Sequence, residues 1–153
     1  MSGERAQTTQ DFAIGVSVFL LAVLFVFAYL PSTLASGDAE IEQRSYVADG
    51  LASSVFGNVS DTDDANQLNG TRTYRFFARH NDTAALRANY SLPATANANV
   101  TLETLQGTPA TVDGGGSTIT AVAGDTYTER AGATTTRIVR LDGTRYRLVV
   151  RVW

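Results

Sequence analysis

Residues 12–30, FAIGVSVFLLAVLFVFAYL, decide the fold of this 153-residue chain. These nineteen residues carry no charge, and only Gly15 and Ser17 lower their hydrophobicity. At about 1.5 Å per residue they form about 28 Å of helix, close to the hydrocarbon thickness of a bilayer. Because a small core seldom needs a helix that is apolar on every side, the stretch predicts a membrane-spanning helix.

Three fates of this helix stay open: a cleaved secretory signal, a permanent anchor, or a segment trimmed on its cytoplasmic side and used for assembly. Residues 32–37, STLASG, offer small residues for signal cleavage, but the apolar run exceeds the usual signal length of about 7–15 residues. Arg5 precedes the run and acids follow it. The positive-inside rule therefore predicts a cytoplasmic N-terminus and an extracellular body.

Composition excludes several classes of function. The net charge of −3 argues against a nucleic-acid binder, because phosphate neutralisation needs a basic surplus. The chain has no Cys, so disulfides and thiolate metal sites are excluded. Its single histidine, His80, stands without a nucleophile elbow, a phosphate-binding loop or a zinc motif. We expect no enzymatic activity, no cofactor and no metal site.

The polar stretch RAQTTQDF, residues 5–12, stands directly before the apolar run. An ordinary anchor needs only positive charge there, so the acid calls for a separate reason. A basic residue, a small residue, a glutamine, an acid and the start of an apolar helix follow in order at Arg5, Ala6, Gln7, Asp11 and Phe12. This order resembles the class III signal peptide of archaeal type IV pilins and archaellins. The composition, with only Arg as basic residue and much Thr, Ala, Asp and Gly, also resembles that of salt-loving archaea.

The resemblance implies a leader at residues 1–6, a transmembrane and assembly helix at 7–34, and an extracellular β-rich domain at 35–153. A prepilin peptidase would cut between Ala6 and Gln7. The pilus assembly machinery would then move the helix from membrane lipid into a surface filament of pilin subunits, of one kind or several, that serves adhesion. In the family Gly is commoner at the position of Ala6 and Glu at that of Asp11, and both differences keep the chemistry.

Asp11 has a defined part in this picture. The free amine of Gln7 on an incoming subunit would be neutralised by Asp11 of a subunit already in the filament, with Phe12 beginning the assembly helix. A buried carboxylate is costly unless it is paired, so such a contact would set the register of assembly. The alternative is a membrane-anchored extracellular binding or structural module that does not polymerise. Asp11 would then cap the helix at the membrane surface.

The region after the apolar run predicts a bend and a second helix. Pro31 favours a break, and Asp38 suits the cap of an amphipathic helix over residues 38–56. Apolar residues follow helical spacing there and form one stripe: Ile41, Ala48, Leu51, Ala52 and Val55. Residues 57–71 are polar and predict a loop, whose acids lack the Gly and the final Glu of a calcium loop.

The rest of the body is typical of β-structure. Runs rich in β-formers predict strands at residues 72–79, 86–92, 99–105 and 117–122. Asp142-Gly143 lies between two alternating runs and predicts a two-residue hairpin that places Arg140 opposite Arg145. One hairpin face is apolar and is assigned to the core: Val139, Leu141, Tyr146, Leu148, Val150 and Val152.

We therefore expect an α+β fold. A long N-terminal hydrophobic helix, broken near Pro31, packs on a C-terminal antiparallel sheet, as the pilin resemblance implies. The other hairpin face collects four basic residues: Arg140, Arg145, Arg147 and Arg151. Like charges opposite each other destabilise a hairpin, so acids of a neighbouring strand or subunit, a bound anion or salt should compensate them. A solvated face, a subunit contact and an anionic surface all stay open.

Five asparagines fit the acceptor pattern for N-glycosylation: Asn58, Asn69, Asn81, Asn89 and Asn99. Turn chemistry also favours Asn near Ser or Thr, so a Thr-rich chain produces some of these patterns by chance. If the acceptors are used, the body lies outside the membrane.

Overall fold

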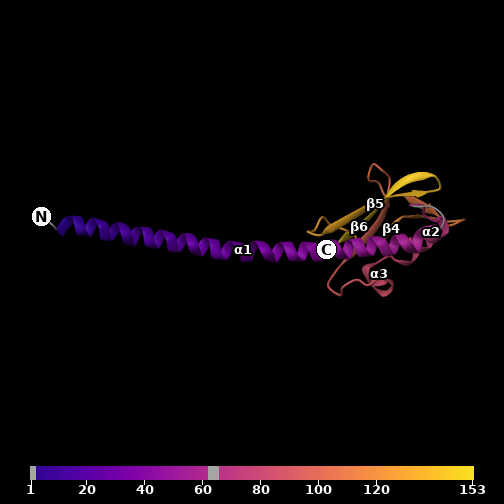
Figure 1. Cartoon of the computed structure of the whole chain (residues 1–153). Helices are drawn as coiled ribbons and strands as arrows, with labels where there is room; N and C mark the ends of the chain where they lie inside the picture. Colours follow the sequence, from indigo (N-terminus) through magenta and orange to yellow (C-terminus); the bar gives the residue numbers. More distant parts are fainter. Residues whose placement is uncertain (1–2, 62–65) are drawn as a thin grey trace. The chain divides into compact units, whose positions relative to one another are not determined.

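The computed structural model describes residues 3–61 and 66–153, and side chains for residues 12–29, 40–61 and 66–153. Within these ranges the protein has one long helix, two short helices and two antiparallel sheets (Figure 1). The chain divides into two compact units, residues 1–40 and residues 41–153. Each unit is described by itself.

Helix α1, Gly3–Val59, supplies the described part of the first unit and the first element of the second. The predicted break near Pro31 is wrong, because the backbone stays helical through Pro31 and through residues 32–37. A proline removes one hydrogen bond and crowds one carbonyl group. A helix that propagates cooperatively through many turns on both sides tolerates that loss.

In the second unit, α1 buries one apolar stripe. Four of the five predicted stripe residues are at most 4% exposed, whereas Ile41 is 57% exposed. The helix also runs past the predicted end at residue 56 and stops at Val59, which is itself buried. Burial of Val59 stabilises the last turn and outweighs the helix-breaking tendency of Gly57.

The main sheet has the strand order β4-β1-β6-β5, and every neighbouring pair is antiparallel. Its strands are β1 (Ala98–Glu103), β4 (Val122–Gly124), β5 (Ala133–Leu141) and β6 (Thr144–Val152). A second, two-stranded sheet pairs β2 (Thr111–Asp113) with β3 (Thr118–Thr120). The predicted α+β class, an N-terminal apolar helix and a C-terminal antiparallel sheet, is confirmed.

The Asp142-Gly143 hairpin is confirmed in its register. Arg140 pairs with Arg145, and Leu141 pairs with Thr144. Asp142 and Gly143 have φ values of 50° and 79°, as a type I′ turn requires of both central residues. The predicted core face is buried except for Tyr146, which packs against the core while partly exposed.

Two predicted strands are helices. Residues 72–79 belong to α2, Gly70–Arg79, whose cap is Asn69: the Oδ1 atom accepts a hydrogen bond of 3.0 Å from the backbone N–H of Arg72. The buried residues Thr73, Phe76 and Phe77 follow helical spacing. Burial of this face outweighs the β-preference of Thr, Tyr and Phe.

Residues 86–92 were likewise predicted as a strand, but helix α3 covers Thr83–Asn89. Asp82 caps it by accepting from the N–H of Ala85 at 2.7 Å. The hydroxyl of Thr83 accepts from the N–H of Ala98 at 3.1 Å. This contact ties α3 to β1, and Leu86 is fully buried in the core beside it.

Candidate functional site

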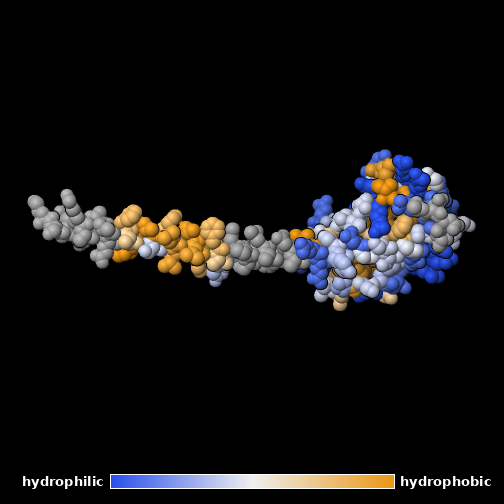
Figure 2. All heavy atoms as spheres, viewed as in Figure 1, coloured by the Kyte–Doolittle hydropathy of each residue, from blue (hydrophilic) through white to orange (hydrophobic). Residues whose placement is uncertain are grey.

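The apolar segment of α1 lies open along its length. Phe12–Tyr29 is long and apolar enough to cross a membrane, and none of this window is buried within the chain. Its large apolar residues other than Val23 are exposed, from 39% at Val16 to 73% at Phe12, and Figure 2 shows the segment as mostly hydrophobic surface. So much exposed apolar surface must be covered by lipid or by other helices. The segment fits a membrane anchor or a signal sequence.

The predicted processing and assembly residues lie at the start of α1. The backbone is helical at Arg5, Ala6, Gln7 and Asp11, whereas their side chains lie outside the described ones. Phe12 is the first side chain described. Gly15 has open space around its Cα, so another helix could approach closely there.

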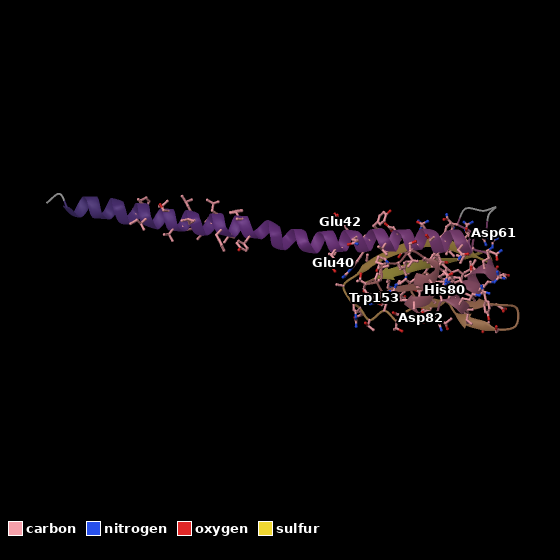
Figure 3. The ribbon with its side chains drawn as sticks, turned by 90° about the horizontal axis from the view of Figure 1, so that it is seen from below. Glu40, Glu42, Asp61, His80, Asp82 and Trp153 are labelled. Carbon is pink, nitrogen blue, oxygen red and sulfur yellow. The ribbon has the colours of Figure 1, made fainter. Side chains whose placement is uncertain are left out.

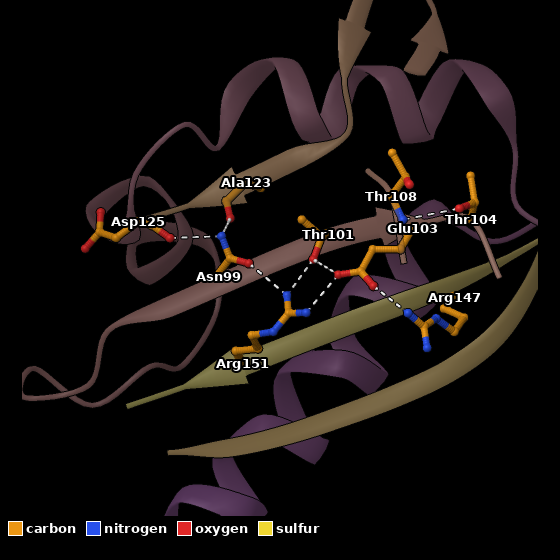
Figure 4. A network of polar contacts seen from close by, with 9 residues as sticks. All are labelled: Asn99, Thr101, Glu103, Thr104, Thr108, Ala123, Asp125, Arg147 and Arg151. Atoms are coloured by element: carbon orange, nitrogen blue, oxygen red, sulfur yellow. Dashed lines mark hydrogen bonds and ion pairs between the residues drawn. The ribbon is translucent and has the colours of Figure 1, made fainter. Parts of the chain in front are cut away.

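The predicted Arg face is compensated in part by an acid of the neighbouring strand. Glu103 of β1 accepts hydrogen bonds from Arg147 Nη2 at 2.9 Å and from Arg151 Nη2 at 2.8 Å (Figure 4). The Glu103 side chain is only 7% exposed. A buried carboxylate needs such partners, because desolvation otherwise penalises its charge. Of the compensations that the sequence left open, the structure contains the acid of a neighbouring strand.

Hydrogen bonds extend this contact across three strands. Thr101 Oγ1 donates to Glu103 Oε1 at 3.2 Å and accepts from Arg151 Nη1 at 2.9 Å. Asn99 Nδ2 donates to the backbone carbonyl of Asp125 at 2.9 Å, just beyond β4. Asn99, Thr101 and Glu103 alternate with core residues along β1. The cluster therefore holds β4, β1 and β6 together on the face opposite the core, and its role is structural.

The other two members of the Arg face behave differently. Arg140 and Arg145 lie opposite each other near the turn and are exposed. Within the described part of the chain, neither side chain has an acidic partner. The sequence did not predict that Arg147 and Arg151 have an acidic partner while Arg140 and Arg145 have none, because this difference depends on which strand lies beside β6.

The five glycosylation acceptors differ in accessibility. Asn58, Asn81 and Asn89 are exposed, and Asn69 is half-buried as the cap of α2. Asn99 is 4% exposed, and its Nδ2 donates to two backbone carbonyls. The folded chain therefore does not present the Asn99 amide at its surface, and glycosylation of these acceptors stays a prediction.

His80 is buried rather than at the surface. Its Nδ1 donates to the carbonyl oxygen of Phe76 at 2.8 Å, and its ring packs at a tilt against those of Phe76 and Tyr90. His80 also lines a pocket of about 280 Å³ whose other walls carry several arginines. Sequence reasoning missed this pocket, because its residues come from three different helices.

Comparison with known protein families gives one match, to the family described as "Family of unknown function (DUF7287)", over residues 3–153. The chain belongs to this family. The match covers the apolar helix and the whole body. Comparisons with curated proteins and with solved structures found no match.

Proposed function

We propose that the chain is a type IV pilin-like subunit. A prepilin peptidase removes residues 1–6, the apolar helix holds the mature chain in the membrane with its body outside, and the assembly machinery then adds it to a surface filament that serves adhesion. The alternative is a membrane-anchored extracellular module that never polymerises.

One observation carries the proposal. The apolar window Phe12–Tyr29 is wholly unburied in the chain, while the later part of the same helix packs its stripe into the core of the body. A single helix thus has one part that needs an external apolar partner and one part that belongs to a folded domain. Lipid meets that need before assembly, and helices of neighbouring subunits meet it afterwards.

The residues before the window give the proposal its chemistry. Cleavage after Ala6 creates an amine on Gln7, four residues from the carboxylate of Asp11. Within a filament of apolar helices both charges are costly unless they pair. Pairing between subunits therefore favours one axial position of each new helix and explains why an acid adjoins an apolar run.

The first experiment measures the intact mass of the chain extracted from its native membranes. A mature chain that begins at Gln7 supports the proposal. A chain that begins at Met1 or Ser2 contradicts it and leaves the anchored module. Replacing Ala6 with Leu should block the cut, because the peptidase site accepts a small residue there.

The second experiment measures filament yield from cells that express Asp11→Ala, Asp11→Glu or Glu42→Gln. We expect assembly to fail for Asp11→Ala and to persist for Asp11→Glu, which keeps the carboxylate. Glu42→Gln removes an exposed acid of the same helix and should assemble normally. Normal filaments from Asp11→Ala would remove the role proposed for this residue.

A further inference from the structure

The pocket beside α2 is strongly basic. It has a volume of about 280 Å³ and is lined by Arg72, Arg75 and Arg79 of α2, by His80, and by the amide side chains of Asn58 and Asn89. The arginines occupy positions i, i+3 and i+7, so they share one face of the helix. Among the residues that the structure describes, no Asp or Glu lines the pocket. Figure 3 shows His80 within the body.

Like Arg140 and Arg145, these three arginines have no acidic partner among the described residues. Arg147 and Arg151 pair with Glu103, and Arg137 donates to Ser53. Among the described residues, the only hydrogen bond from a guanidinium of the pocket runs from Arg72 Nη1 to the carbonyl oxygen of Ser60, at 3.1 Å. Three exposed arginines therefore line one pocket without a counter-charge from the described residues.

The position of Arg72 in the helix adds a second unfavourable electrostatic term to the repulsion among the three arginines. It lies in the first turn of α2, where the helix dipole disfavours a cation, and that turn contains no acid. Arg79 in the last turn suits the dipole, but Arg75 between them repels both neighbours. An anion bound at this face would offset the repulsion and the unfavourable dipole term at once.

The chemistry of the walls indicates the kind of anion. Guanidinium groups present planar forks of N–H donors that match the oxygens of an oxyanion. The amide groups of Asn58 and Asn89 each donate one N–H within the chain, to Tyr90 Oη and to the carbonyl oxygen of Ala85, and their second N–H is a neutral donor in the pocket wall. Three charges favour a group with more than one negative charge over a monovalent carboxylate. We propose that this pocket binds a phosphate or sulfate group, carried by a small molecule or a saccharide. The site is independent of the proposed assembly function.

Isothermal titration calorimetry tests the proposal on the full chain in uncharged detergent micelles. The probes are inorganic phosphate, inorganic sulfate and acetate, at ionic strength matched with sodium chloride. We expect saturable binding at one site for phosphate or sulfate, and acetate at least about tenfold weaker. Tighter binding of phosphate would point to a phosphate ester as the natural ligand, and tighter binding of sulfate to a sulfate ester. Heat that follows ionic strength alone, or tighter binding of acetate, would overturn the proposal.

Matched variants locate the site. Arg75→Gln and Arg79→Gln should each weaken binding at least about tenfold. Arg130→Gln removes an exposed arginine outside the pocket and should leave affinity within about twofold. Equal losses in all three variants would indicate diffuse attraction and contradict a defined site. The urea unfolding midpoint, read from Trp153 fluorescence, confirms that each variant is folded. Phosphate and sulfate raise this midpoint in any folded protein because they are excluded from its surface, so the rise should be larger in the wild type and in Arg130→Gln than in the two pocket variants.

Discussion

Oε1 of Glu103 lies 2.8 Å from Nη2 of Arg151, and this contact joins β1 to β6 on the sheet face opposite the core. The second oxygen of Glu103 is taken by Arg147. One nearly buried carboxylate thus faces two guanidinium groups that remain partly exposed, with side chains 22% and 34% exposed for Arg151 and Arg147. The acid is the member of the cluster whose removal leaves the most charge unbalanced.

Replacing Glu103 with Gln should lower the free energy of unfolding of the body by about 2–4 kcal/mol, because two partly buried cations lose their counter-charge. The measurement is urea unfolding of the full chain in uncharged detergent, followed by the fluorescence of Trp153, the single tryptophan. Glu129→Gln, at an exposed acid, should stay within about 0.5 kcal/mol of the wild type. An equal, small effect of both variants would contradict the role assigned to Glu103.

Two glycines with nearly the same backbone conformation should respond very differently to alanine. Gly124 and Gly143 have φ values of +80° and +79°. A Cβ at Gly143 meets open space, whereas one at Gly124 collides with the carbonyl oxygen of Ala98. Gly143→Ala should cost about 1–2 kcal/mol for the left-handed conformation alone.

Gly124→Ala should cost at least about 3 kcal/mol by the same urea measurement, because a collision with the backbone of β1 adds to the conformational cost. The collision cannot be relieved by a side-chain rotation, since Ala98 O lies on the neighbouring strand β1. Similar losses at both glycines would show that the close approach of β4 to β1 does not restrict Gly124.

The parts of the fold that the sequence predicts correctly rest on local signals. Asp142-Gly143 supplies two residues that tolerate positive φ, and the alternating pattern on both sides favours the one register that buries the apolar face. The prediction of a membrane-spanning helix is also local, since it needs only the length of the apolar run and its lack of charge. Neither prediction depends on knowing which elements are neighbours in space.

The errors arise where local preferences disagree. Residues 72–79 contain Thr, Tyr and two Phe, which favour strands, but Thr73, Phe76 and Phe77 also stand at helical spacing behind a capping Asn69. The cap and the spacing were the signals that could have predicted α2. Because residues 72–79 were predicted as a strand, Arg72, Arg75 and Arg79 could not be placed on one helix face, and the basic pocket could not be predicted from the sequence.

For the Arg face, the sequence predicted an acid of a neighbouring strand as one kind of partner, but not which residue it is. Compensation of the Arg face by a neighbouring strand was among the expectations, but Glu103 could be named only once β1 is known to lie beside β6. The strand order depends on how loops and helices pack, and a single sequence carries no direct signal for it.

Replacing Asn99 with Ala should lower the free energy of unfolding by about 1–3 kcal/mol, because the carbonyl oxygens of Ala123 and Asp125 lose a buried donor. Asn81→Ala is the matched change at an exposed acceptor and should stay within about 0.5 kcal/mol. Mass spectrometry of peptides from the native protein gives a second readout. A glycan on Asn99 of the folded chain would contradict its buried position.

Tyr90 should make the stability of the body depend on alkaline pH. Burial raises the pKa of its phenol above the usual value of 10.0, against a smaller opposing effect of the hydrogen bond from Asn58 Nδ2. In the unfolded chain the phenol loses its proton near the usual pKa, while the folded chain retains it to higher pH. The folded state then binds more protons, so the free energy of unfolding falls as pH rises from the unfolded towards the folded pKa.

Tyr90→Phe should therefore show a smaller fall in the free energy of unfolding between pH of about 9 and about 11 than the wild type. The substitution also removes the hydrogen bond from Asn58. That loss lowers the free energy of unfolding equally at every pH below the titration of Tyr90, so the quantity to compare is the slope of the free energy of unfolding against pH. The control is Tyr46→Phe, because Tyr46 is 81% exposed; this variant should keep the wild-type slope. Identical slopes for wild type and Tyr90→Phe would mean that the phenol ionises equally easily in the folded and unfolded chain, and that the contact between α1 and the segment after α3 does not exclude water from Tyr90.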